Sequence, residues 1–81
     1  MARVILSRMC QPWAGDVTEL DLDVPNIRAL IRALDERFPG LGEQVEESMA
    51  VAIDGVIFQD SLLDPIPADA EVALIPRIAG G

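Results

Sequence analysis

Gly80 and Gly81, the last two residues of the sequence, are the positions whose types and spacing most clearly suggest chemistry. Two residues without Cβ can pass through a slot that excludes side chains. The terminal carboxylate would then be an acyl group at the end of a narrow segment. Fully extended, residues 76–81 reach at most about 20 Å, at about 3.3–3.6 Å per residue. The alternative is an ordinary chain end, since small residues are common at frayed termini.

The side chains offer little other chemistry. Histidine and lysine are absent from the sequence, and Cys10 is its one cysteine. No Cys-His or Ser-His pair can form, no internal disulfide is possible, and the ligand count excludes a zinc-type site. We therefore expect no catalytic side chain, no bound cofactor and no metal, with Cys10 as a bystander thiol. An acyl group activated at Gly81 would also find no lysine amine in its own chain.

Length and charge describe a small acidic domain. The sequence has 81 residues, enough for one hydrophobic core. Hydrophobic residues make up 51% of it, yet the formal net charge is −8, so an apolar interior must lie inside an acidic surface. Nucleic acid and anionic membranes are poor partners for such a surface. The sequence has neither a run of about 18 apolar residues nor a charged-then-apolar leader, so we expect a cytoplasmic protein.

The first half of the chain predicts two strands and a helix. An apolar run within residues 3–8 fits a strand in the middle of a sheet, and the alternation in residues 18–24 fits a half-buried strand in a hairpin with it. Residues 9–16 predict a loop, in which Trp13 is either a lid on the core or an exposed anchor. Asn26 can cap a helix whose apolar residues recur at three- and four-residue spacing.

The second half predicts a hairpin and a last strand. Residues 41–48 are acidic and polar, which predicts a surface connection with at most an irregular helical turn. An Asp-Gly pair between two apolar runs predicts a hairpin over residues 49–58. Residues 59–71 predict a loop, and residues 72–75 predict a strand whose hydrogen bonding Pro76 ends.

Together these elements predict an α+β fold in one domain, residues 1–81. It is a mixed sheet of about five strands with one main helix packed on one face and a flexible Gly-Gly tail, residues 76–81. Burial on both sides places the last strand beside the first, and the helical crossover makes the two parallel. The tail then leaves the sheet unobstructed.

This order of elements resembles the β-grasp, or ubiquitin-like, fold, and with its Gly-Gly ending it is most similar to the bacterial sulfur carriers. That family includes the small subunit of molybdopterin synthase and the thiamine-pathway sulfur carrier. The resemblance covers the whole chain, and its most specific parts are residues 51–55, 69–72 and 75–81. The ending is nearer the molybdopterin-synthase type, although aliphatic residues replace aromatic ones before the proline and Arg77 replaces a second proline.

The resemblance implies a carrier protein rather than an enzyme, or the small, sulfur-donating subunit of a two-subunit synthase. Gly81 would be adenylated and converted to a thiocarboxylate, with Gly80 and Ala79 threading the partner's channel. The implied partners are a ubiquitin-activating-type adenylating enzyme that uses ATP, a persulfide sulfur donor, and a large catalytic subunit or acceptor synthase. The sulfur would serve molybdopterin synthesis. The alternatives are thiamine or another sulfur metabolite, a non-covalent interaction module, and ubiquitin-like conjugation to lysines.

The partner-binding surface is expected near the tail, at Leu74, Pro76, Arg77, Ile78 and Phe58. Leu74 and Phe58 are equally consistent with ordinary core residues. Arg77 is the cation of the tail. It either solubilises the end of the last strand or pairs with a carboxylate in the partner's channel.

Overall fold

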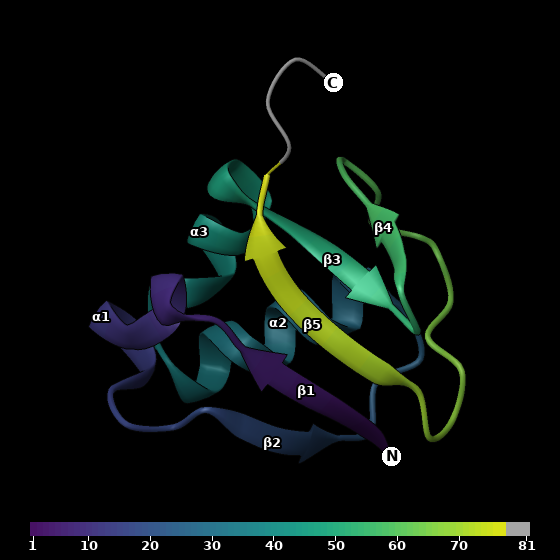
Figure 1. Cartoon of the computed structure of the whole chain (residues 1–81), viewed down its shortest axis with the longest axis horizontal. Coiled ribbons are helices and arrows are strands. Elements are labelled where there is room, and N and C mark those ends of the chain that lie inside the picture. The colour runs from purple at the N-terminus through teal and green to yellow at the C-terminus, as the bar shows by residue number, and fades with distance from the viewer. Residues whose placement is uncertain (78–81) are drawn as a thin grey trace.

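The structure, a computed structural model, describes residues 1–77, which fold around one mixed β-sheet. The strands lie in the order β2-β1-β5-β3-β4, and the main helix, α2, packs on one face of the sheet (Figure 1). In chain order the elements are β1 (Ala2–Leu6), the 3-10 helix η1 (Arg8–Cys10), α1 (Gln11–Ala14), β2 (Glu19–Leu22), α2 (Ile27–Arg37), α3 (Leu41–Ser48), β3 (Met49–Ile53), β4 (Val56–Phe58) and β5 (Glu71–Pro76). The predicted α+β architecture is confirmed for these residues.

The first and last strands are neighbours in the middle of the sheet. β1 pairs antiparallel with β2 and parallel with β5, which places Val4 opposite Val72. Both valines are completely buried, as the apolar runs in the sequence predict. The predicted parallel pairing is therefore confirmed. Because β1 and β5 run in the same direction, β5 ends at the opposite end of the sheet from Met1 (Figure 1).

The hairpin of β3 and β4 turns at Asp54 and Gly55, as predicted. Both residues have positive φ angles, 48° and 86°, as a tight two-residue turn between antiparallel strands requires. The Asp54 carboxylate also accepts a hydrogen bond from the backbone N of Glu71, at 2.9 Å. The turn is thereby joined to the start of β5.

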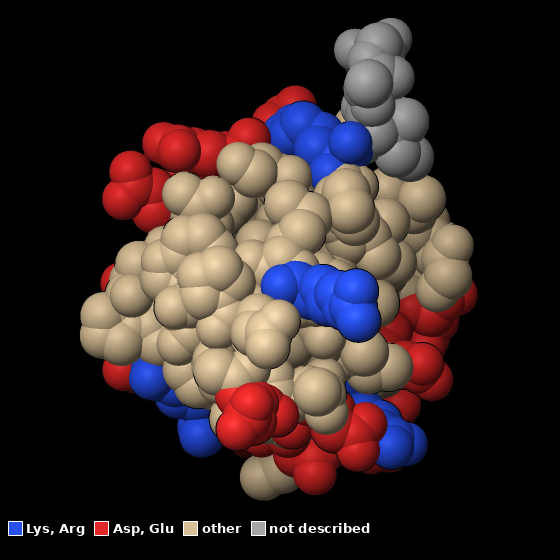
Figure 2. Space-filling model, turned by 60° about the vertical axis from the view of Figure 1, so that its left-hand side comes forward, with Lys and Arg blue, Asp and Glu red and all other residues tan. Residues whose placement is uncertain are grey.

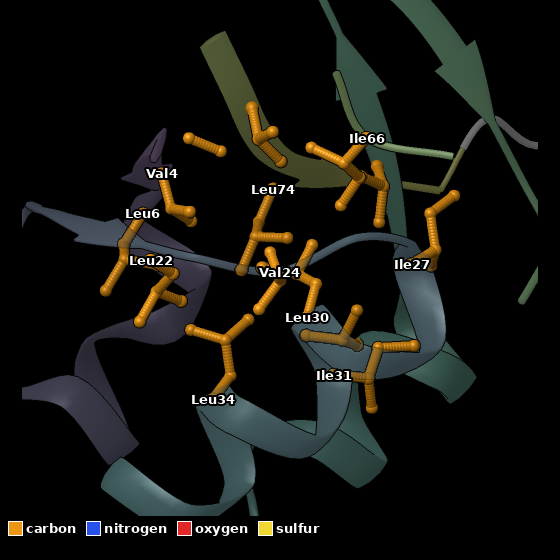
Figure 3. Packing of buried hydrophobic residues seen from close by; sticks show 14 of the residues in the cluster. Val4, Leu6, Leu22, Val24, Ile27, Leu30, Ile31, Leu34, Ile66 and Leu74 are labelled. Carbon is orange, nitrogen blue, oxygen red and sulfur yellow. The ribbon is translucent and has the colours of Figure 1, made fainter. Parts of the chain in front are cut away.

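Helix α2 covers the sheet because its apolar residues fall on one side. The side chain of Asn26 caps the helix by accepting a hydrogen bond from the backbone N of Ala29, at 2.8 Å. Figure 3 shows the buried side chains of α2 packed against those of the strands, with Leu74 of β5 pointing into the cluster. Burying a large aliphatic side chain contributes about 1.5–3 kcal/mol. The buried residues of α2 are Ile27, Leu30, Ile31 and Leu34.

The segment between β1 and β2 is helical rather than the predicted loop. It contains η1 and α1, and both helices are too short to produce a helical periodicity in the sequence. Trp13 of α1 is partly buried and packs against the core. Of the two roles that the sequence left open for Trp13, the structure supports the lid on the core.

Residues 41–48 also correct the prediction, because they form the two-turn helix α3 rather than an irregular connection. Leu41 and Val45 are buried, but two apolar residues make too short a stripe to be read from the sequence. No side chain at the preceding residue caps the helix. Instead, the carboxylate of Asp35 in α2 accepts hydrogen bonds from the backbone N atoms of Gly40 and Gly42, at 3.0 and 3.2 Å.

The last strand is longer than the sequence indicated. β5 runs to Pro76, which pairs with Met49 of β3, so the predicted tail of residues 76–81 begins inside the strand. Proline has no N–H to donate, and it is tolerated here at the last position of the strand. The segment that follows the sheet therefore starts after Pro76.

Candidate functional site

The candidate site is the end of β5, where the chain continues towards its carboxyl terminus. Arg77 is the last residue that the structure describes. Gly81, Gly80, Ala79 and Ile78 lie outside the described residues. Their predicted roles in adenylation, threading and docking therefore stay predictions, and the geometry of the site is that of the residues leading to them.

Arg77 is held by the domain itself. Its Nη1 donates to Oδ1 of Asp60 at 2.8 Å, and its Nη2 donates to the carbonyl oxygen of Glu46 at 2.7 Å. Its backbone N donates to the carbonyl oxygen of Ser48 at 3.2 Å. The side chain of Arg77 is 27% exposed, and that of Asp60 is 77% exposed. The sequence offered no signal for Asp60 and Glu46, because neither lies near Arg77 along the chain.

The other predicted partner-binding residues differ in their surroundings. Pro76 is exposed. Leu74 is only 1% exposed and belongs to the core cluster, so it has the core role rather than a place on a docking surface. The alternation of β5 explains this: Val72 and Leu74 face α2, and Ile75 faces the other way, half-buried. Phe58 is half-buried and packs at the border of the core.

Phe58 also lines an open cavity of about 220 Å³ beside the end of β5. The cavity lies between α2, α3, the β3–β4 hairpin and the segment that follows β4. Six of its nine lining residues are hydrophobic, and the lining also includes Glu46 and Asp60, the two residues whose oxygen atoms bind the Arg77 side chain. The lining residues are Ile27, Ile31, Glu46, Met49, Val51, Phe58, Asp60, Ser61 and Leu62.

Cys10 is completely buried, with its Sγ 3.9 Å from the Sδ of Met49. Burial raises the pKa of the Cys10 thiol above its ordinary value, because the thiolate loses its hydration. A raised pKa lowers the thiolate fraction at any given pH. Within residues 1–77, no cluster of three or more metal-ligating side chains occurs, and no helix has the length and apolar character to cross a membrane.

We therefore predict that Cys10 reacts with iodoacetamide at least about tenfold more slowly in the folded protein than in guanidinium chloride, at one pH, because burial limits both access and ionisation. Mass spectrometry of quenched samples measures the two rates. Equal alkylation rates in the folded and the denatured protein would show that the Cys10 thiol is at the surface, and a chemical role for it would then have to be considered.

The sequence matches the ThiS family over residues 6–81, nearly the whole chain. The chain belongs to the ThiS family. As a ThiS-family protein it is a ubiquitin-like sulfur carrier or modifier, and the small carriers of this family are not enzymes themselves. No curated protein matches it in sequence.

Solved structures share the fold of this ThiS-family chain. CysO of Mycobacterium tuberculosis, described as an antigen, has a TM-score of 0.82 and 15% identity, over 96% of this chain and 100% of CysO. A chain of the BexX/CysO complex of Amycolatopsis orientalis has a TM-score of 0.81 and 16% identity, over 100% of both chains. The small archaeal modifier protein 1 of Methanosarcina acetivorans has a TM-score of 0.76 and 20% identity, over 99% of this chain and 95% of the modifier. The β-grasp fold predicted from the sequence is thus confirmed.

Proposed function

We propose that this protein carries sulfur as a thiocarboxylate at Gly81 and donates it in the synthesis of a sulfur-containing cofactor, molybdopterin. The observation that carries the proposal is the combination of a ThiS-family β-grasp domain with a sequence that ends in Gly-Gly a few residues after the central strand of the sheet. The assignment to molybdopterin rests on the sequence of residues 75–81, which is nearer to that type of carrier.

The chemistry follows from the reactivity of a carboxylate. An α-carboxylate, with a pKa of about 3.3–3.7, is ionised at neutral pH and is a poor electrophile. An adenylating enzyme would join it to the α-phosphate of ATP and release pyrophosphate. A persulfide sulfur would then displace AMP, and cleavage of the sulfur–sulfur bond by a thiol would leave the thiocarboxylate on Gly81. ATP belongs to the partner, and we propose no cofactor bound to the carrier.

The partners would be a ubiquitin-activating-type adenylating enzyme, a persulfide sulfur donor, and an acceptor synthase in which this chain serves as the small, sulfur-donating subunit. The BexX/CysO complex supports an acceptor or activating partner, since a protein of this fold is found there in an assembly. We place the partner-binding surface around Pro76, Arg77, Ile78 and Phe58. The acidic surface would steer the carrier to a basic partner, which makes association salt-sensitive.

Mass spectrometry of the intact protein tests the proposal. After incubation with the adenylating enzyme, ATP and a sulfur donor, the carrier should gain the mass of one sulfur replacing one oxygen, located at Gly81 by fragmentation. Addition of the molybdopterin precursor and the large synthase subunit should return the carrier to its original mass. If the thiocarboxylate forms but the synthase cannot discharge it, the sulfur serves the synthesis of thiamine or of another sulfur metabolite. If the mass of the carrier does not change at all, the remaining function is that of a non-covalent interaction module.

A second candidate function is conjugation to other proteins. Two of the structures that share the fold are small archaeal modifier proteins, from Methanosarcina acetivorans and Haloferax volcanii. In this function the activated Gly81 would form an isopeptide bond with a lysine of a target. A ladder of carrier-linked proteins that survives denaturation and thiols would establish it, and the absence of lysine from the chain would prevent chains of the carrier on itself through lysine.

A further inference from the structure

Arg77 joins three parts of the domain at the point where the sheet ends. Its side chain binds Asp60, in the segment after β4, and the carbonyl oxygen of Glu46 near the end of α3. Its backbone N binds the carbonyl oxygen of Ser48, the last residue of α3. We call these three hydrogen bonds the Arg77 clasp. Figure 2 shows acidic side chains beside a cationic one at this end of the molecule.

The clasp compensates for an unfavourable helix end. The last carbonyl groups of a helix lack partners within it and carry partial negative charge. In α3 this end also carries Glu46 and Glu47, whose negative charges are unfavourable there. Arg77 brings a positive charge to it and satisfies two carbonyl groups, those of Glu46 and Ser48. A neutral residue at position 77 could supply only the backbone hydrogen bond.

The clasp also shortens the segment that has to reach the partner. With Arg77 fixed, residues 78–81 remain to reach a partner's active site, a span of at most about 13–14 Å at about 3.3–3.6 Å per residue. The point from which they start, Arg77, is set by the sheet and α3 rather than by the partner. A chain that is already ordered loses less conformational entropy on binding, about 1–2 kcal/mol less for each residue whose backbone is fixed.

We infer that Arg77 is a positioning residue for the loading of the carrier: bound to Asp60 and to α3, it fixes the point at the end of the sheet from which residues 78–81 reach the adenylating enzyme. This inference rests on the proposed function. It differs from the sequence-based expectation that Arg77 pairs with a carboxylate in the partner's channel. In the structure the guanidinium already has a carboxylate partner, Asp60, and is mostly covered.

Substitution of Asp60 distinguishes the two roles, because it acts on Arg77 without changing it. Asp60 has a positive φ angle of 59°, so Asp60→Gly removes the carboxylate without backbone strain. If the clasp positions the chain, Asp60→Gly should weaken recognition by the adenylating enzyme. If Arg77 must instead enter the partner's channel, Asp60→Gly should release it and leave recognition equal or stronger.

The experiment measures ATP–pyrophosphate exchange by the adenylating enzyme as the concentration of the full-length carrier is varied. We expect Arg77→Ala and Asp60→Gly each to raise the KM about fivefold, the equivalent of ordering about one backbone residue, and to leave kcat within about twofold. The double variant should resemble Arg77→Ala, because that variant already lacks the ion pair with Asp60. The matched control is Arg3→Ala, which removes an exposed ion pair with Glu19 at the other end of the sheet and should leave KM unchanged.

A second measurement on the free carrier separates failure of the inference from failure of the proposed function. The NMR order parameter of the Arg77 amide should be near 0.85, about that of rigid backbone, in the wild type and should fall towards 0.6 in Asp60→Gly. An unchanged order parameter, or additive KM effects of the two substitutions, would overturn the clasp. If the wild type is not adenylated at all, the proposed function fails, and the order parameters still decide whether Asp60 holds Arg77.

Discussion

A chain that ends at Gly80 should fold as the wild type does and yet lose at least about 100-fold in its rate of adenylation. The shortened carboxylate falls about 3.3–3.6 Å short of its place, and a displacement of about 1 Å from the reacting position can already cost about 100-fold. The fold should persist because, within residues 1–77, the last residue of the core cluster is Leu74. Pyrophosphate exchange at saturating carrier measures the loss, and circular dichroism with urea unfolding verifies the fold.

Gly81→Ala is the length-matched control for this truncation. It keeps the carboxylate in reach but adds a methyl group at the tip, so it reports on the width of the channel alone. We expect a loss smaller than that of the truncated chain. Adenylation of the truncated chain at the wild-type rate would show that the enzyme does not recognise the terminus, and the carrier function would then be untenable.

Leu74→Ala should lower the free energy of unfolding by about 2–5 kcal/mol, the usual cost of replacing a buried leucine with alanine. Leu74 is 1% exposed and lies in the central strand, where Figure 3 shows it pointing into the cluster between the sheet and α2. The loss is a large share of the total stability of a small domain, which is about 5–15 kcal/mol. Urea unfolding measures it as a lower midpoint at an unchanged slope.

Ile75→Ala is the matched control, because Ile75 is the next residue of the same strand and faces the opposite side, half-buried. Its loss should be near 1 kcal/mol, since only part of its side chain is removed from water. Where Leu74→Ala remains folded, the KM for adenylation should equal that of the wild type. A stable Leu74→Ala variant with a raised KM would return Leu74 to the docking surface.

The sheet could be predicted from the sequence because its signals are local. The alternation of residues 18–24, the Asp54-Gly55 turn and the cap at Asn26 each fix a short stretch through contacts with near neighbours, and the structure has all three. Even the parallel pairing of β1 with β5 follows from local elements, given the helix between the hairpins.

The parts that could not be predicted depend on residues that are distant in the sequence. Helix α3 has a short apolar stripe and is capped by Asp35 of the preceding helix, which no pattern within residues 41–48 reveals. An apolar residue such as Leu74 is equally typical of a core and of a protein interface. Only the face of the sheet to which its side chain points decides between the two. The Arg77 clasp joins α3 to two segments that lie outside the helices and strands, so the sequence showed a cation but not its partners.

The parallel pair in the middle of the sheet also determines how the domain can fold. β5 separates the β1–β2 hairpin from the β3–β4 hairpin, and its pairing with β1 brings residues 3 and 71 together. Such a distant contact must overcome the entropy of closing nearly the whole chain into a loop, and an isolated two-stranded hairpin is only marginally stable. We therefore expect slow, all-or-none folding for a domain of this length. The strand that completes the fold is β5, which leads into the C-terminal segment, so a partly folded chain cannot hold Arg77, the start of that segment, at the end of the sheet.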